Sequence, residues 1–391
     1  MSFSDRVEKL ESEGAYIVMA RANQLTAKGK DIIHLEIGQP DFPTYPHIAK
    51  AGMDAISEGF TRYTSPAGMP DLREVIAKDA GERRGMKIDP SEVVVGPGGK
   101  PGLLFPTLAL VEPGSVDEVI YPDPGFPTYV AMVDIAGGVH KPVPLSEEKD
   151  FSFNLEEFNQ LVSDRTRLVV INTPANPTGG IMPISDLEKI AEAAQKHDFW
   201  VMSDEIYSRL TYDGLTAPSI ATLPGMKERT IIVDGFSKTY SMTGWRLGYS
   251  IMPEPLAERI SLLYTHSIGC TAAFTQIAGI EAITGPQDMV DDVVKEYQQR
   301  RDVMVEGLNN IPGVTCRIPQ GAFYAFPNVS SFKIPSQELA LRILDESGVA
   351  LLSGTDFGPH GEGYLRLCYA NSIDKIKLAL VRLKGFFGKL Y

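Results

Sequence analysis

The chain has 391 residues, of which 43% are hydrophobic and 22% charged, and its 50 acidic and 37 basic residues give a net charge of −13. This length and composition exclude a small cross-linked module and a disordered chain, and they predict a folded protein with more than one core. The negative charge disfavours nucleic acid and anionic membrane surfaces as partners.

Cysteine use and the first residues predict a cytoplasmic protein. Cys270, Cys316 and Cys368 form no C-x-x-C pair, so we expect neither a disulfide framework nor a zinc knuckle. The first ten residues are charged where a secretory signal would be apolar, and no run reaches the length of a membrane span. The six histidines form no H-E-x-x-H motif and no G-x-S-x-G elbow occurs, so no metal and no serine hydrolase chemistry is expected.

Short apolar runs alternate with helical patterns between residues 93 and 233. The runs have the length of strands and lie at 93–95, 118–121, 168–172, 199–202 and 231–233. A crossover helix is predicted from residue 184 to 194, with a capping box formed by Ser185 and Glu188 at its start. This alternation is typical of an α/β fold with a mostly parallel central sheet flanked by helices.

The pattern breaks at residues 284–288, which predicts a domain boundary. After it, an amphipathic helix at 291–306, a helix at 336–347 and an alternating strand at 364–369 suit a smaller α+β domain. The alternation places Arg366 on the strand face opposite the leucines, from which it can point into a cleft. An arginine there suits a carboxylate substrate.

Three of the predicted strands run into polar residues that are unusual in a core. These residues are Asn176, then Asp204 with Tyr207, then Lys238. In an open parallel sheet the ligand site lies outside the carboxyl ends of the strands, so one pocket could collect all four. A lysine for a Schiff base, an acid for a pyridine nitrogen and two hydrogen-bonding groups would suit pyridoxal phosphate (PLP). Taken singly, Asp204 could cap a helix, Lys238 could be a solvated loop lysine and residues 176–179 could be a turn.

A glycine-rich segment at 96–99 follows the first predicted strand, and Lys100 with Pro101 begins a predicted helix. Backbone amides there could hold a phosphate, although a tight turn explains the segment equally well. Neither nucleotide-binding fingerprint fits, because position 101 is neither glycine nor a hydroxyl residue. Arg246, eight residues after Lys238, could bind a phosphate with two nitrogens or form a surface ion pair.

The chain resembles the class I and II aminotransferases of PLP fold type I, and within them bacterial aspartate-type aminotransferases. Three segments in this order and spacing carry the resemblance: Asn176-Pro-Thr-Gly, Ser203-Asp-Glu-Ile-Tyr207, and Ser237-Lys-Thr through Gly244-Trp-Arg246. The likeness extends from Ile37 to Leu367 and so covers nearly the whole chain. It implies a large PLP-binding domain at 47–285 and a small domain built from 1–46 and 286–391.

The resemblance also implies a role for each matching residue. Lys238 would form the Schiff base with PLP, and Asp204 would keep the pyridine nitrogen protonated. Tyr207 and Asn176 would bond the ring oxygen, and Phe126 would stack on the ring. The phosphate would be bound by Arg246, Ser237, the backbone at Gly99 and Lys100, and Tyr63 of the partner subunit in a homodimer, and the substrate α-carboxylate by Arg366, Asn176 and the backbone of Gly38.

We therefore expect an amino group to pass from aspartate, glutamate or a broader set of amino acids to a 2-oxo acid such as 2-oxoglutarate, by a ping-pong mechanism. Lys100 matches the distal-carboxylate contact of aspartate-type enzymes. Tyr16 stands where small hydroxyl residues are common and would make that end of the pocket more apolar. Two alternatives stay open: a PLP lyase or decarboxylase of the same fold, and a catalytically silent PLP-binding sensor.

Overall fold

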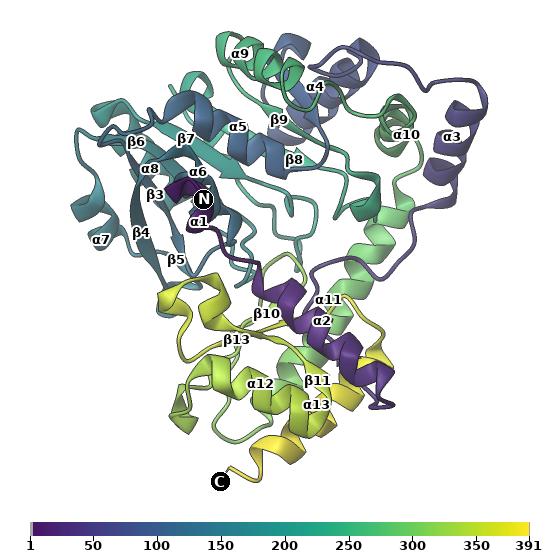
Figure 1. The fold of residues 1–391 in the computed structure, drawn as a ribbon, viewed down its shortest axis with the longest axis vertical. Helices are drawn as coiled ribbons and strands as arrows, with labels where there is room; N and C mark the ends of the chain where they lie inside the picture. The colour runs from purple at the N-terminus through teal and green to yellow at the C-terminus, as the bar shows by residue number, and fades with distance from the viewer. Residues whose placement is uncertain (1–2, 391) are drawn as a thin grey trace.

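The computed structural model describes residues 3–390, and its core is an eight-stranded mixed sheet (Figure 1). In sheet order the strands are β2 (Val93–Gly96), β9 (Gly248–Ile251), β8 (Thr230–Gly235), β7 (Trp200–Asp204), β6 (Thr166–Asn172), β3 (Glu118–Asp123), β4 (Val139–Ser146) and β5 (Ser152–Phe153). The neighbours from β8 to β4 run parallel, whereas β9 is antiparallel to both β2 and β8, and β5 is antiparallel to β4. The predicted mostly parallel central sheet is confirmed.

Helices cover both faces of this sheet. The helices α5 (Lys100–Leu110), α6 (Thr128–Ala136) and α9 (Glu254–Thr265) pack on one face, and α7 (Leu155–Leu161) and α8 (Ile184–His197) pack on the other. In β6, Leu168 and Val170 join the first of these cores and Val169 and Ile171 join the second. A strand buried on both faces is apolar at nearly every position, which is why the sequence predicted it.

A further set of helices packs beside β2: α3 (Pro46–Ser57), α4 (Pro70–Arg84) and α10 (Ala273–Thr284). In α4, Leu72, Ile76 and Ala80 repeat at helical spacing and are fully buried. The helix ends at Gly85, whose φ of 66° is the left-handed conformation that favours glycine. The last residue of α4, Arg84, is buried and forms an ion pair with Glu205, the residue that follows β7.

The other elements form a second unit, which lies below the large sheet in Figure 1. It contains the antiparallel strands β10 (Tyr324–Ala325), β13 (Leu365–Cys368) and β12 (Leu352–Ser353), the parallel pair β1 (Ile33–His34) and β11 (Val349–Ala350), and the helices α2 (Gly14–Ala27), α11 (Asp288–Asn309), α12 (Ser336–Ser347) and α13 (Ile373–Phe387). Helix α1 (Asp5–Glu8) instead contacts α6. Because β1 pairs with β11, we propose to keep the predicted division into 47–285 on one side and 1–46 with 286–391 on the other.

One local prediction is wrong. Helix α8 begins one residue before Ser185, with Pro183 at the capping position and no side-chain cap. The carbonyl of Pro183 already accepts from the N–H groups of Asp186 and Leu187, so Ser185 lies inside the first turn and cannot form the capping box with Glu188. Within residues 3–390 no three His, Cys, Asp or Glu side chains gather where they could hold a metal, and no helix is long and apolar enough to cross a membrane.

Candidate active site

The ends of β6 and β7 are joined by hydrogen bonds. The Asn172 side-chain amide donates to the backbone carbonyl of Asp204 (2.9 Å), and the backbone N–H of Asn176 donates to Asn172 Oδ1 (2.8 Å). Lys238, from the end of β8, lies with its Nζ 5.9 Å from the ring centre of Tyr207. The structure therefore brings together the four residues on which the prediction of one pocket depended.

Asp204 is a buried carboxylate. The Tyr129 hydroxyl donates to its Oδ2 (2.7 Å) and the backbone N–H of Ile206 to its Oδ1 (3.3 Å). Burial raises its pKa to about 6, and the negative charges of Asp234 and Glu205 act in the same direction, against these two hydrogen bonds. Residues 206–209 form a turn and not a helix, so the helix-cap explanation is wrong. No ion pair among the described residues includes Asp204, which is therefore suited to a cationic ligand atom.

Lys238 is enclosed by aromatic rings and backbone. Its Nζ donates to the Gly38 carbonyl (2.5 Å) and lies 5.6 Å from the ring centre of Phe323. Burial lowers its pKa to about 8, helped by the positive charges of Arg366 and Arg246. An amine with this pKa gives up its proton near neutral pH and can act as a nucleophile, so the solvated-loop explanation is wrong.

Tyr207 shares a hydrogen bond between hydroxyl groups with Tyr324 of β10 (2.7 Å). Both rings are buried, and burial raises the pKa of Tyr207 well above its usual value of 10. A Cβ at Gly38 would meet the Tyr324 hydroxyl, so only glycine fits at that position. Tyr207 and Tyr324 are therefore neutral hydroxyls near Lys238, and one of them has a proton left to donate to a ligand.

Arg366 is buried between two rings, with its guanidinium carbon 4.5 Å from the ring centre of Tyr324 and 4.9 Å from that of Phe357. Its Nη1 donates to Asn176 Oδ1 (3.3 Å) and its Nη2 to the Glu36 carbonyl, while the buried Nε has no partner. Buried donors are rarely left unpaired. A carboxylate ligand would satisfy this one.

The glycine-rich segment meets Arg246 beside a cavity of about 600 Å³. Arg246 Nη2 donates to the Pro97 carbonyl (3.2 Å) and Nη1 to the Thr243 carbonyl (2.8 Å). A Cβ at Gly98, whose φ is 90°, would clash with this guanidinium. Arg246 has no ion pair within the described part of the chain, so the surface ion pair is wrong. Gly99 precedes α5, whose first-turn amides are free to hold an anion.

Three of the remaining predicted residues, Phe126, Ser237 and Lys100, lie around this centre. Phe126 packs edge-on against Tyr129, with ring centres 5.8 Å apart, and Ser237 is buried after β8. Lys100 forms an ion pair with Glu13, and its Nζ lies 5.5 Å above the Phe126 ring. The structure does not bring Tyr16 or Tyr63 into the pocket: Tyr16 on α2 is 57% exposed and Tyr63 is 96% exposed.

The family model for aminotransferase class I and II matches residues 30–383. The chain belongs to this family. It is 39% identical to a putative aminotransferase of Bacillus subtilis, over 99% of this chain and 98% of the relative, and 38% identical to the aspartate aminotransferase of Geobacillus stearothermophilus, over 99% of both. The crystal structure of an aromatic aminotransferase from Pyrococcus horikoshii matches it with a TM-score of 0.90 at 37% identity, covering 95% of this chain and 100% of that one.

This class I and II aminotransferase is therefore a PLP-dependent transaminase with the α/β architecture of PLP fold type I, acting on amino acids and 2-oxo acids. The residues present fit the cofactor. Lys238 is an amine with a lowered pKa, Asp204 is a buried acid that forms no ion pair with another described residue, and Gly98 opens a cradle at Arg246 that any larger residue would fill.

Three residues of this aminotransferase site were not predicted from the sequence: Tyr129, Tyr324 and Phe357. Tyr129 and Tyr324 hydrogen-bond Asp204 and Tyr207, and Phe357 packs on Arg366. None of the three segments that carry the resemblance contains them, because each reaches the site by tertiary packing from a different element. One available signal was the aromatic run of Phe323, Tyr324 and Phe326 in and around β10, which pairs with β13 beside Arg366.

Proposed function

We propose that this aminotransferase moves the amino group of aspartate, glutamate or a broader set of amino acids to a 2-oxo acid such as 2-oxoglutarate, as a cytoplasmic homodimer working by a ping-pong mechanism. The observation that carries the proposal is the position of Arg366 near Lys238. A buried guanidinium with an unpaired Nε can bind a substrate carboxylate beside an amine whose pKa is about 8. An α-amino acid has both groups that such a pair recognises.

Bound PLP supplies an electron sink that stabilises negative charge at the substrate α-carbon. The Lys238 amine is proposed to hold the cofactor and then to move the proton at the α-carbon, for which a pKa near the working pH is favourable. Asp204 is proposed to bind the protonated ring nitrogen, and Tyr207 with Asn176 the ring oxygen. Phe126 would cover one face of the ring and exclude water.

In this proposal the phosphate of the cofactor and the carboxylate of the substrate are bound by separate groups. Arg246, Ser237 and the amides at Gly99 and Lys100 bind the phosphate. Arg366, Asn176 and the Gly38 backbone orient the substrate α-carboxylate. Support comes from the enclosure of Arg366 by two rings, which removes water and so strengthens its charge interactions.

Replacement of Lys100 by alanine tests the donor specificity. We expect kcat/KM for aspartate and glutamate to fall about tenfold or more, because a charge-assisted hydrogen bond of roughly 1.5 to 3 kcal/mol is lost. Alanine and phenylalanine should be unaffected. The measurement is an amino-donor panel with 2-oxoglutarate, followed by keto-acid formation, with Lys50→Ala as a control because Lys50 is also an exposed lysine in an ion pair.

An unchanged ratio of acidic to apolar donors in Lys100→Ala would mean that Lys100 serves the phosphate end alone, or that its pair with Glu13 holds it away from substrate. Relatives named for aspartate and for aromatic amino acids have nearly equal identity to this chain, so the panel includes both. Silence of the wild type across all donors would instead favour a lyase or a silent PLP-binding sensor.

The homodimer is tested through Tyr63. Its ring is 96% exposed in the single chain, although Tyr63 is a large aromatic residue. We expect sedimentation velocity to show a dimer. The Tyr63→Phe variant should remain a dimer but bind PLP about tenfold more weakly, because one hydrogen bond to a charged group is lost. Dilution below the dimer dissociation constant should also weaken PLP binding. A fully active monomer would refute both expectations.

A further inference from the structure

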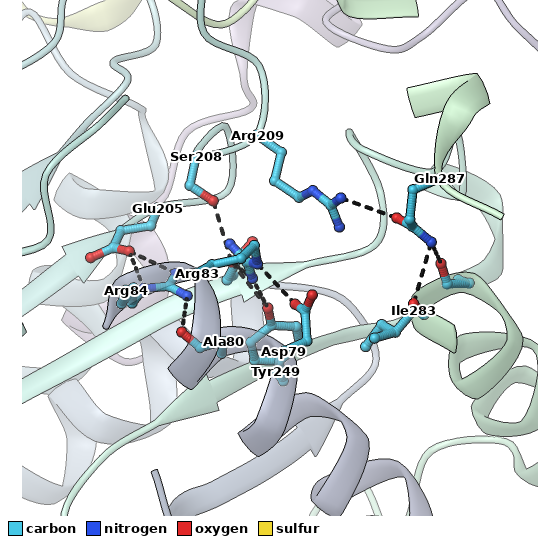
Figure 2. Close-up of polar contacts among 12 residues, drawn as sticks. Asp79, Ala80, Arg83, Arg84, Glu205, Ser208, Arg209, Tyr249, Ile283 and Gln287 are labelled. Atoms are coloured by element: carbon cyan, nitrogen blue, oxygen red, sulfur yellow. Dashed lines mark hydrogen bonds and ion pairs between the residues drawn. The ribbon is translucent and has the colours of Figure 1, made fainter. Parts of the chain in front are cut away.

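A buried group of charges lies at the carboxyl ends of β7 and β8 (Figure 2). One of its members, Glu205, directly follows Asp204 in the chain. The two strands are parallel and in register, with Asp204 opposite Val233, and the N–H of Glu205 donates to the Val233 carbonyl (2.8 Å). Side chains alternate along a strand, so Glu205 and Asp234 lie on the sheet face opposite Asp204. The side chains of Glu205 and Asp234 are therefore separated from that of Asp204 by the strand backbone alone.

Arg84, the last residue of α4, binds both of these carboxylates. Its Nη2 lies 2.7 Å from Glu205 Oε2 and 3.1 Å from Asp234 Oδ2, and its Nε donates to Glu205 Oε2 (2.9 Å). The three side chains are 5%, 4% and 5% exposed. Arg83 also reaches Asp234 Oδ2 (3.5 Å), but it is more exposed and its shorter contact is with Asp79 (2.9 Å). Arg84 is thus the main counter-charge of both acids.

Neutral donors complete this group, as Figure 2 shows in part. The hydroxyls of Ser203 (2.8 Å) and Ser219 (2.6 Å) donate to Glu205 Oε1, and the Tyr249 hydroxyl donates to Asp234 Oδ2 (3.0 Å). Hydroxyls lower the cost of burying a carboxylate without cancelling its charge. Without Arg84, no cation among the described residues would pair with Glu205, and Asp234 would keep only its longer contact with Arg83.

Negative charge at these positions acts directly on Asp204. Glu205 and Asp234 both oppose its ionisation, and a like charge close by disfavours the charged form of an acid. The two groups that donate hydrogen bonds to Asp204, the Tyr129 hydroxyl and the Ile206 N–H, carry no charge. The titratable groups that face or influence Asp204 are Tyr129, Glu205, Tyr207, Asp234 and Lys238.

We propose that Arg84 is a positioning residue for the cofactor: its guanidinium neutralises Glu205 and Asp234 from the far face of the sheet and so keeps Asp204 charged for the ring nitrogen of PLP. This inference rests on the proposed role of Asp204. Arg84 acts through the two acids and touches neither cofactor nor substrate. The effect of Arg84 on PLP binding is therefore electrostatic and should depend on pH. A purely structural role of Arg84 would weaken binding equally at every pH.

The test is the dissociation constant of PLP, measured by equilibrium dialysis from pH 5 to pH 9. In the wild type, binding should weaken as the pH falls through about 6, where Asp204 takes up a proton. In Arg84→Met this weakening should begin about one pH unit higher, so the variant binds roughly threefold more weakly near pH 6.5 and roughly tenfold more weakly at pH 5, while at pH 9 the two agree. Arg84→Lys should recover much of the shift.

Arg73→Met is the matched control. Arg73 is also in α4, but it donates to the Val93 carbonyl and touches neither Glu205 nor Asp234. It should keep the wild-type pH profile. Should Arg84→Met fail to fold, Glu205→Gln keeps the test open, because removal of one negative charge should move the weakening to lower pH.

The proposed role of Arg84 would be overturned if PLP binding by Arg84→Met were weakened equally at every pH. It would also be overturned if the pH profile were unchanged in both Arg84→Met and Glu205→Gln.

The variant Asp204→Asn separates a failure of the role of Arg84 from a failure of the proposed function. It should remove the acid-side weakening altogether. If the weakening persists in Asp204→Asn, then Asp204 is not the group that PLP binding requires, and the proposed role of that residue is itself refuted.

Discussion

Replacement of Lys238 by alanine is expected to lower kcat/KM at least about a thousandfold and to leave the protein folded. Two functions are lost together, the amine that holds the cofactor and the group that moves the α-proton, and the second alone contributes about a hundredfold to ten-thousandfold. The fold should survive because, within the described residues, the Nζ donates a hydrogen bond to the Gly38 carbonyl alone and forms no ion pair. Steady-state kinetics and thermal unfolding of the variant measure both effects.

The control for this variant is Lys227→Ala, which removes a surface lysine paired with Glu92 and should keep full activity. Activity of Lys238→Ala within tenfold of the wild type would mean that another group moves the proton. The lowered pKa of Lys238, about 8, would then have no catalytic meaning and would reflect burial alone.

Replacement of Asp204 by asparagine is expected to lower kcat about a hundredfold or more, since a charge next to the reacting system is lost. The same change should make the cofactor-free protein more stable at pH 8. Burial raises the pKa of Asp204 from 3.8 to about 6, so its ionisation opposes folding. The folded state binds the proton more tightly than the unfolded one, and stability is therefore lost as the pH rises from about 4 to about 6.

The expected gain in apo-protein stability at pH 8 is on the order of 2 kcal/mol, from a shift of about two pKa units less the weakened bond from Tyr129. At pH 4 the acid is protonated, so the gain should vanish. Thermal unfolding at both pH values measures it, with Asp164→Asn as an exposed control. A variant that is less stable than the wild type at pH 8 would show that Asp204 serves the fold.

The central strands could be predicted because they are buried on both faces, but β4 and β9 could not. Pro142 and Pro144 lie within β4, and proline is normally evidence against a strand inside a sheet. The short strand β9 follows the loop of Arg246 and has no distinct pattern of its own. The start of α8 at Ile184 agrees with the prediction, but its capping box was wrong because Ser185 has the residue type of a cap, whereas the extended Pro183 holds the capping position.

The site could be predicted where chemistry sits in contiguous motifs at strand ends. Asp204, Tyr207 and Lys238 belong to such motifs, whereas Tyr324 and Phe357 reach Arg366 only through the packing of separate short elements. Arg84 was invisible for the same reason, since nothing in α4 indicates which carboxylates it meets. The roles of Tyr16 and Tyr63 stay predictions, because their exposed rings depend on what a second chain adds.

Borohydride reduction of the holoenzyme, followed by peptide mapping, tests the attachment of PLP most directly. Reduction fixes the cofactor to whichever amine carries it. We predict one modified peptide with the pyridoxyl group on Lys238, because this lysine has a pKa lowered to about 8 and lies near Arg366 and Arg246. A pyridoxyl group on Lys100 or any other lysine, with Lys238 unmodified, would contradict the proposed site.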